Sequence, residues 1–344
     1  MSQNKKRVAV VTGSAGFIGY HISKTLLESG WQVIGIDCIT DYYDVSLKLK
    51  REANLATFKN YRAVNERIER AGFLHGLFLK EKPEIVIHLA AQVGVRSSIN
   101  EPRSYLESNI IGAFELLEAA KLFPPKHILM ASTSSAYGAN SKMPYSELDR
   151  ADHQMSFYAA SKKSMENMAH SYSHLYKLPI TIFRFFTVYG PWGRPDMAIF
   201  KFTKSIFRNE PIDAYNYGDV KRDFTFIGDL TQSVVNLIEC KPFSRGVSNQ
   251  RTSVNDNLSP VAPYRVVNIG NSAPVKVMDL ISALEKEIGR KALINLAPMQ
   301  AGDVYATWAN VKLLKDLTGY QPSTDLIVGV SEFVNWYKDF YELT

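Results

Sequence analysis

The sequence has 344 residues, 46% of them hydrophobic and 22% charged, which is the composition of an ordinary globular protein of roughly two domains. The net charge of +6 comes from basic residues that are scattered apart from residues 5–7, so we expect no nucleic-acid partner. Cys38 and Cys240 are too few for a disulfide framework, and no apolar run approaches the ~20 residues of a membrane span, so we expect a cytoplasmic protein with no membrane partner.

The N-terminal stretch has the pattern of a dinucleotide-binding β-α-β unit. The apolar run Val8–Thr12 predicts a strand buried on both faces, and the glycine-rich run Gly13–Gly19 follows it at once. A helical pattern covers Tyr20–Ser29, and a second strand, Gln32–Ile36, ends in Asp37. The glycines permit a tight turn against a pyrophosphate at the helix N-terminus, and the carboxylate can accept hydrogen bonds from the adenosine ribose. Because this carboxylate would repel a 2′-phosphate, NAD is favoured over NADP.

Alternating strand and helix patterns continue to about residue 186. Residues 41–62 have no clean period, whereas the following segments do. The predicted elements are helix 67–79, strand 85–91, helix 109–122, strand 127–131, a helix that reaches about residue 176, and strand 179–186. The repetition predicts an α/β fold with a doubly wound parallel sheet.

A hydroxyl cluster and a Y-x-x-x-K pattern carry the candidate chemistry. Strand 127–131 leads into Ser132-Thr133-Ser134-Ser135, and Tyr158 and Lys162 lie four positions apart on the next helix, on one face. A phenol with a pKa near ~10 is a poor base at neutral pH, but a lysine within ~4–6 Å, or a cationic nicotinamide, lowers this pKa. Thr133 could hold the same substrate oxygen. The pattern therefore predicts a base that takes a proton from an alcohol while hydride leaves, although Y-x-x-x-K also arises by chance.

The alternation breaks after residue 188. Residues 189–197 are predicted as a loop, and 241–263 have no periodicity, which is typical of a functional or mobile segment. The remaining predictions are helix 197–209, segment 211–226, helix 228–239, strand 266–270, and helices 277–289 and 310–318.

The motifs in this order resemble the extended short-chain dehydrogenase/reductase family over nearly the whole chain. Five stretches indicate a particular branch of this family: 88–98, 184–198, 215–230, 262–272 and 298–304. Together they are similar to the bacterial UDP-glucuronate 4-epimerase family, the capsule-precursor branch of the nucleotide-sugar epimerases. The resemblance implies a Rossmann sheet with a smaller, mostly C-terminal α/β substrate domain, tightly bound NAD, a UDP-sugar substrate and a homodimer. It implies that residues 1–188 with 224–270 bind NAD and that 189–223 with 271–344 bind the UDP-sugar.

Three other functions remain as alternatives at this stage. Epimerases for UDP-glucose or UDP-N-acetylglucosamine usually have Asn where Thr187 stands. Related dehydratases and uronate decarboxylases usually carry an acidic residue within the hydroxyl cluster, where this chain has Ser134 and Ser135. A non-catalytic NAD-binding regulator would typically lack the tyrosine or the lysine.

The resemblance also implies roles for individual residues. Tyr158 is the base, Lys162 lowers its pKa and binds the nicotinamide ribose, and Thr133 contacts the sugar. The cofactor-binding positions are Gly13, Gly16, Phe17, Ile18, Gly19, Asp37, Ile68, Leu89, Ala90, Ala91, Asn109, Ala131, Tyr158, Lys162 and Val188. The substrate-binding positions are Arg96, Thr133, Ser134, Ser135, Thr187, Arg194, Tyr215, Arg222 and Asp303.

Within the substrate set, Arg194, Arg222 and Asp303 correspond to residues that hold the nucleotide diphosphate and ribose, and Tyr215 to an aromatic near the uracil. Without the resemblance, the two arginines could be surface salt-bridge partners. Arg67 stands where many relatives have an Asp that contacts the adenine. No metal site is expected, although His170 and His174 are four apart.

Overall fold

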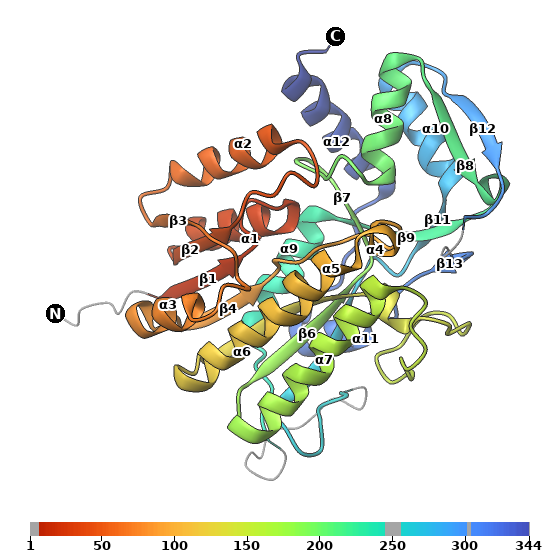
Figure 1. The fold of residues 1–344 in the computed structure, drawn as a ribbon. Coiled ribbons are helices and arrows are strands. Elements are labelled where there is room, and N and C mark those ends of the chain that lie inside the picture. The colour runs from red at the N-terminus through yellow and green to blue at the C-terminus, as the bar shows by residue number, and fades with distance from the viewer. Residues whose placement is uncertain (1–6, 245–255, 301–303, 344) are drawn as a thin grey trace.

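The computed structural model describes residues 7–244, 256–300 and 304–343, and its largest element is a parallel sheet (Figure 1). The sheet has seven strands in the order β10-β6-β5-β4-β1-β2-β3. Its strands are β1 (Val8–Thr12), β2 (Gln32–Asp37), β3 (Tyr61–Asn65), β4 (Ile85–His88), β5 (His127–Thr133), β6 (Ile180–Phe185) and β10 (Tyr264–Ile269). The order reverses between β1 and β4, as in a doubly wound Rossmann sheet, so the predicted fold class is confirmed.

Helices cover both faces of this sheet, which explains its continuous apolar strands. In β1, Ala9 and Val11 belong to one hydrophobic core and Val10 to the other. The first core is covered by α1 (Phe17–Glu28), α2 (Val45–Ala56), α9 (Ile227–Ile238) and α11 (Lys312–Thr318). The second is covered by α3 (Phe73–Glu81), α6 (Gly112–Leu122) and α7 (Phe157–Tyr176). Both faces are therefore buried, and the carboxyl edge of the sheet is left for ligands.

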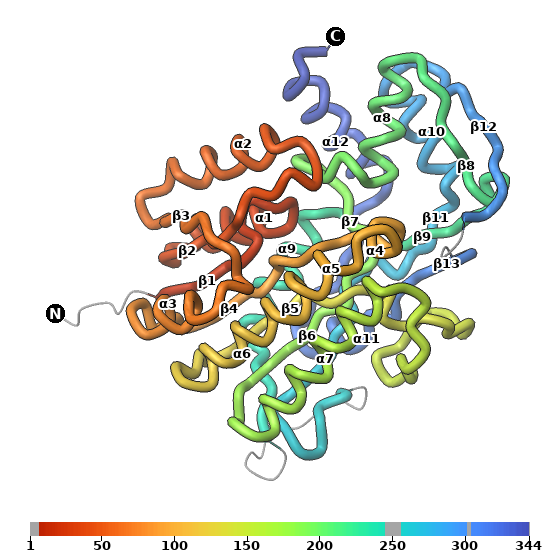
Figure 2. The backbone as a smooth tube through the Cα atoms, in the orientation of Figure 1, coloured from red at the N-terminus to blue at the C-terminus, as the bar shows by residue number. Residues whose placement is uncertain are grey.

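A smaller part lies beyond the carboxyl end of β6, where the chain continues into β7. One sheet joins β7 (Thr187–Tyr189), β9 (Lys221–Phe226), β11 (Pro274–Lys276) and β13 (Ala306–Thr307), and another pairs β8 (Pro211–Tyr215) with β12 (Leu293–Ala297). Its helices are α8 (Ala198–Arg208), α10 (Val277–Ile288) and α12 (Leu326–Tyr341). Figure 2 shows how 198–215 and 274–297, distant in sequence, run side by side.

Short helical turns complete the path along the chain. They are α4 (Ser97–Asn100), α5 (Pro102–Tyr105), the π-helical turn η1 (Leu106–Ile111), and the 3-10 turns η2 (Ser134–Tyr137) and η3 (Asn216–Gly218). Among the helices described, none combines the length and the apolar character needed to cross a bilayer.

Residues 41–62, which have no clean period in the sequence, contain α2 and the start of β3. The buried positions of α2 include Leu47, Lys48, Arg51 and Leu55. Because two charged side chains occupy the buried face, the apolar period of a helix is hidden in the sequence.

Other predicted boundaries also shift. Helix 67–79 begins only at Phe73, after Gly72, whose φ of 76° is outside the helical region, and Arg67 lies in the loop after β3. Residues 109–111 belong to η1 rather than to a regular α-helix. Segment 211–226 contains two strands, β8 and β9, and α12 has no predicted counterpart. Residues 245–255 of the segment 241–263 lie outside the described residues.

Glu147 provides a stability prediction away from the candidate site. One of its carboxylate oxygens accepts a hydrogen bond from the backbone N–H of Asn268 at 2.8 Å, and burial raises the pKa of Glu147 to about 7. A carboxyl whose folded pKa is raised stabilises the fold fully below pH ~4.5 and loses that contribution as pH rises to about 7. We expect Glu147→Gln to increase the free energy of unfolding at pH 8 by on the order of 1–3 kcal/mol, with a much smaller gain at pH 5.

Thermal melts of both proteins at the two pH values measure this effect. The control is Glu210→Gln, which changes an exposed carboxylate that is 3.9 Å from Arg208. Equal gains for Glu147→Gln at both pH values would contradict the assignment of the effect to Glu147 ionisation.

Candidate active site

Tyr158, Lys162 and Thr133 meet at the carboxyl end of β5. The helix α7 begins at Phe157, and the side chain of Ser156 caps it by accepting a hydrogen bond from the N–H of Ala159 at 3.1 Å. This start places Tyr158 in the first turn and Lys162 one turn later, where Nζ donates to the carbonyl oxygen of Ala131 at 2.8 Å. The Thr133 hydroxyl, at the end of β5, interacts with the Tyr158 hydroxyl.

Burial has the largest effect on the pKa values of Tyr158 and Lys162. Burial raises the pKa of Tyr158, and the Thr133 hydroxyl and the positive charge of Arg194 lower it only in part. Burial also lowers the pKa of Lys162 to about 8, against the influence of Glu166. In the chain without a cofactor the pKa of Tyr158 is therefore raised, because the loss of hydration outweighs the effects of the Thr133 hydroxyl and of Arg194. A bound cationic nicotinamide ring next to the phenol would lower the pKa of Tyr158, which is the change that a base requires.

The glycine-rich turn lies directly against the end of β4. Gly13 has a φ of 74°, and a Cβ there would come within 2.8 Å of the backbone nitrogen of Ala90, so only glycine fits. The hydroxyl of Thr12 accepts hydrogen bonds from the N–H groups of Leu89 and Ala90, each at 3.1 Å, and it lies 2.9 Å from Nδ1 of His88. The two turns expected to line the cofactor are thus fixed to each other.

Asp37 lies at the carboxyl end of β2, beside the same turn. Its two oxygens accept hydrogen bonds from the backbone N–H groups of Ala15 at 3.1 Å and Ile39 at 2.9 Å. Four other expected cofactor positions, Phe17, Ile68, Ala131 and Val188, are buried side chains, whereas Gly16 and Ile18 are partly buried and Gly19 is buried.

Asn109 is a structural connection rather than a free group. It lies in the π-helical turn, is 1% exposed, and bonds the backbone of Gln92 through both amide atoms at 2.8 and 3.0 Å. Its Nδ2 also donates to the hydroxyl of Ser161 at 2.9 Å. Asn109 therefore holds the segment after Ala91 against the helix that carries Tyr158 and Lys162.

Four of the expected substrate residues lie in the segments that follow β5 and β6. Ser134 and Ser135 form η2 directly after Thr133, and Thr187 opens β7. Arg194 pairs with Asp196 through two hydrogen bonds, and it also influences the titration of Tyr158, so it lies close to the base.

The other substrate residues lie around β8 and β9. The guanidinium of Arg222 in β9 donates to the carbonyl oxygen of Lys221 at 2.9 Å. The guanidinium of Arg96 lies over the ring of Tyr215, at 5.0 Å from its centroid. Asp303 lies outside the described residues.

Sequence reasoning missed a buried ion pair behind the candidate base. Glu166 lies one turn after Lys162 on α7 and continues its four-residue spacing, which was the available signal. It accepts hydrogen bonds from Nε and Nη2 of Arg184 in β6, at 2.9 and 2.6 Å, and from the hydroxyl of Ser132 at 2.6 Å. Because Ser132 directly precedes Thr133, this pair supports the strand end that carries the candidate hydroxyl.

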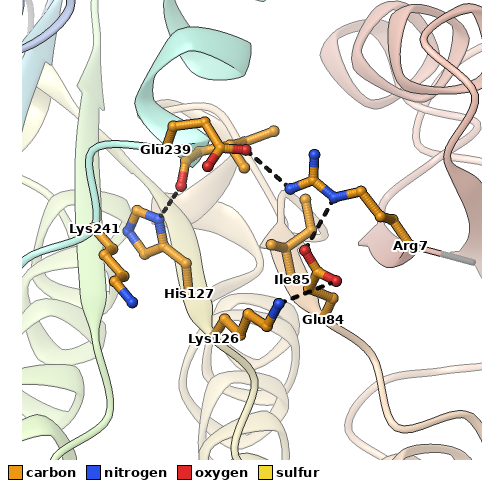
Figure 3. Close-up of a pocket in the computed structure, with 8 residues that line it drawn as sticks. Arg7, Glu84, Ile85, Lys126, His127, Glu239 and Lys241 are labelled. Atoms are coloured by element: carbon orange, nitrogen blue, oxygen red, sulfur yellow. Dashed lines mark hydrogen bonds and ion pairs between the residues drawn. The ribbon is translucent and has the colours of Figure 1, made fainter. Parts of the chain in front are cut away.

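A hollow lined largely by charged side chains lies at the opposite edge of the sheet. It has a volume of about 600 Å³ and lies at the amino ends of β1, β4 and β5 (Figure 3). Arg7 pairs with Glu84 at 3.0 Å and with Glu239 at 2.9 Å, and Lys126 also pairs with Glu84 at 3.4 Å. Ligands of open parallel sheets bind at the carboxyl edge, so we place the site at Tyr158 and not in this hollow.

Comparison with known proteins agrees with this geometry. Residues 10–333 match the family model described as GDP-mannose 4,6 dehydratase. A protein of Rhizobium meliloti (strain 1021) named "Probable UDP-glucuronate 4-epimerase" is 50% identical, and the alignment covers 96% of this chain and 97% of that protein. The chain belongs to the UDP-glucuronate 4-epimerase family.

Solved structures of the family have the same fold. The UDP-glucuronic acid 4-epimerase from Bacillus cereus, in complex with UDP-glucuronic acid and NAD, is 32% identical with a TM-score of 0.86, over 97% of this chain and all of that one. A tyrosine-to-phenylalanine mutant of the same enzyme, in complex with UDP-4-deoxy-4-fluoro-glucuronic acid and NAD, is 31% identical with a TM-score of 0.86 over the same shares. The recognised family is therefore confirmed, and it includes structures that hold both expected ligands.

Proposed function

We propose that this protein is an NAD-dependent UDP-glucuronate 4-epimerase that interconverts UDP-glucuronate and UDP-galacturonate. The observation that carries the proposal is the convergence of Tyr158, Lys162 and Thr133 at the carboxyl end of β5, near the turns of Gly13 and Leu89. NAD fits this edge, because glycine is required at Gly13 and Asp37 stands at the end of β2. When bound, NAD supplies the acceptor for the C4 hydride and returns that hydride to the opposite face of the sugar.

The chain's own residues move the proton and hold the sugar. Tyr158 takes the proton of the 4-hydroxyl and returns it after the ring of the 4-keto sugar has turned. Thr133 holds the same oxygen, and Lys162 favours the phenolate once a cofactor is bound. NAD is regenerated in each cycle, so we expect it to stay tightly bound.

A uronate substrate makes a further demand on the site. Its 4-keto form is a β-keto acid that can lose CO₂, so the carboxylate must be held in a conformation that is poor for decarboxylation. The hydroxyls of Thr133, Ser134, Ser135 and Thr187 are neutral donors at or just after the carboxyl ends of β5 and β6, and no acidic side chain interrupts residues 132–135. This favours the epimerase over the related dehydratases. We assign the diphosphate and uridine to Arg194, Arg222, Asp303 and Tyr215, with Arg96 beside Tyr215.

The organisation of the chain is part of the proposal. We infer that residues 1–188 with 224–270 bind NAD, and that 189–223 with 271–344 bind the UDP-sugar. We also infer a cytoplasmic homodimer that pairs through η1, α6 and α7. Phe114, Leu122 and Leu175 on these helices are 43, 51 and 62% exposed, so apolar side chains are available on this face for contact with a partner. Light scattering after gel filtration tests the dimer, which requires twice the chain mass of 38.7 kDa.

The decisive experiment for the reaction is NMR of the purified protein with UDP-glucuronate and no added cofactor. We expect UDP-galacturonate to appear, which requires both the epimerase activity and the retained NAD. If the product forms only after NAD is added, the proposed reaction is supported but the expectation that the protein retains NAD is wrong. If UDP-glucuronate is untouched while UDP-glucose is epimerised, the protein is a galactose-type enzyme.

A further inference from the structure

Arg51 is a buried arginine that the proposed reaction does not use. It lies on α2 and is 0% exposed, although the helix otherwise faces the surface along much of its length. The other deeply buried arginines, Arg184 and Arg265, each form a two-bond pair with a carboxylate, Glu166 and Asp256 respectively. Among the described residues Arg51 forms no ion pair, and its Nε has no hydrogen-bond partner. A buried charge without a carboxylate in direct contact is unfavourable, so its retention requires a reason.

The hydrogen bonds of Arg51 join two turns that lead to different ligands. Its Nη1 donates to the carbonyl oxygen of Ala15 at 3.0 Å, within the glycine-rich turn, and to the hydroxyl of Tyr43 at 2.7 Å. Its Nη2 donates to the carbonyl oxygens of Trp192 at 2.5 Å and Gly193 at 3.2 Å. Residue 194, which follows directly, is the arginine assigned to the UDP diphosphate. One guanidinium therefore connects the glycine-rich turn, where we expect the cofactor, to the 190–194 turn, which contains the arginine assigned to UDP.

The 190–194 turn has an unusual backbone conformation that the bonds from Arg51 help to hold. Trp192 has a φ of 62°, which is unusual for a residue with a bulky side chain, and such residues persist only where their surroundings hold them. A second bond comes from α1, where Nε2 of His21 lies 2.9 Å from the carbonyl oxygen of Pro191. Burial lowers the pKa of His21 to about 4, so the ring is neutral and its Nε2–H donates. Three consecutive carbonyl groups are thus fixed by the part of the chain that carries the cofactor turn.

We propose that Arg51 is a positioning residue that sets the UDP-diphosphate site by fixing the 190–194 turn onto the glycine-rich turn. The proposal rests on the proposed function, because it takes a UDP-sugar as the ligand of Arg194. Its buried positive charge also lies between the two places where an anionic pyrophosphate and an anionic diphosphate are expected. Arg51 then acts on the substrate through Arg194 without touching it.

The test measures UDP affinity by calorimetry, together with kcat and KM, on Arg51→Met, Arg51→Lys and His21→Leu. We expect Arg51→Met to weaken UDP binding and raise KM by about tenfold or more, while kcat changes by less than about threefold. Lysine keeps the charge but cannot reach carbonyl groups of both turns, so Arg51→Lys should not restore UDP affinity. His21→Leu should weaken UDP binding by about threefold, because it removes one of the bonds to the turn.

The control is Lys50→Met, which removes the neighbouring exposed cation on the same helix. If Arg51→Met does not fold, His21→Leu decides the question, since it leaves the buried charge in place. Unchanged UDP affinity in the folded variants, or a loss in kcat with KM unchanged, would overturn the proposal. If the wild-type protein itself binds no UDP, the proposed function fails, which is a separate result.

Discussion

Tyr158→Phe is expected to abolish epimerisation while leaving the fold intact. Phenylalanine keeps the ring that packs edge-to-face on Tyr105, with centroids 6.0 Å apart, and removes only the hydroxyl that would accept the proton. General base catalysis contributes about 10²–10⁴-fold, so we expect kcat to fall by at least about this factor. Burial already disfavours the phenolate, so the loss of the hydroxyl should change the melting temperature little.

The measurement is turnover of UDP-glucuronate followed by NMR, with melting temperature and NAD content of the purified protein as parallel readouts. Tyr176→Phe is the matched control, because it removes a tyrosine hydroxyl near the end of the same helix, at a side chain that is 41% exposed. A Tyr158→Phe protein that retained more than about a tenth of the wild-type turnover would remove Tyr158 from the role of base.

The parallel sheet and the candidate base could be predicted from sequence because local pattern determines them. Val8–Thr12 and His127–Ala131 are apolar because both faces of the sheet are covered, and the glycine at position 13 is required by its own backbone conformation. The spacing of Tyr158 and Lys162 fixes their common face once the helix is recognised. These features need no knowledge of distant contacts.

The features that were missed depend on partners far away in the chain. The helix α2 has no apolar period because Lys48 and Arg51 are buried in it, and Arg51 is satisfied by carbonyl groups of residues 15, 192 and 193. The strands β8 and β12 are short and partly exposed. They form a sheet only by pairing with each other, although the paired residues, such as Pro211 and Leu293, are 82 positions apart in the sequence. Likewise, Arg96 stacks on Tyr215 through tertiary contact alone.

The pair Glu166–Arg184 provides the largest expected effect on stability. Both side chains are at most 3% exposed, and the pair joins α7 to β6. Burial disfavours the charged carboxylate, but Arg184, together with Lys163 at 3.1 Å and the hydroxyl of Ser132, outweighs it and holds the pKa of Glu166 below its usual value. Removing one member of a buried pair leaves the other charge uncompensated, which costs about 3–5 kcal/mol. We therefore expect Glu166→Gln to lower the melting temperature by roughly 4–7 °C at neutral pH.

The pH dependence of stability and a double variant distinguish the contribution of the Glu166 charge from that of side-chain packing. A carboxyl with a lowered folded pKa stabilises the fold above pH ~4.5 and loses this contribution as pH falls through the folded value, so the difference between wild type and Glu166→Gln should shrink in acid. Glu166→Leu combined with Arg184→Met should recover most of the loss, because an apolar pair of similar volume is often neutral. The control is Glu107→Gln, which breaks an exposed pair with Arg103 and should cost at most ~1 kcal/mol. Equal melting temperatures for Glu166→Gln and this control would show that Arg184 finds compensation elsewhere, and the pair would then owe its place to the support of Ser132 beside the reacting hydroxyl of Thr133.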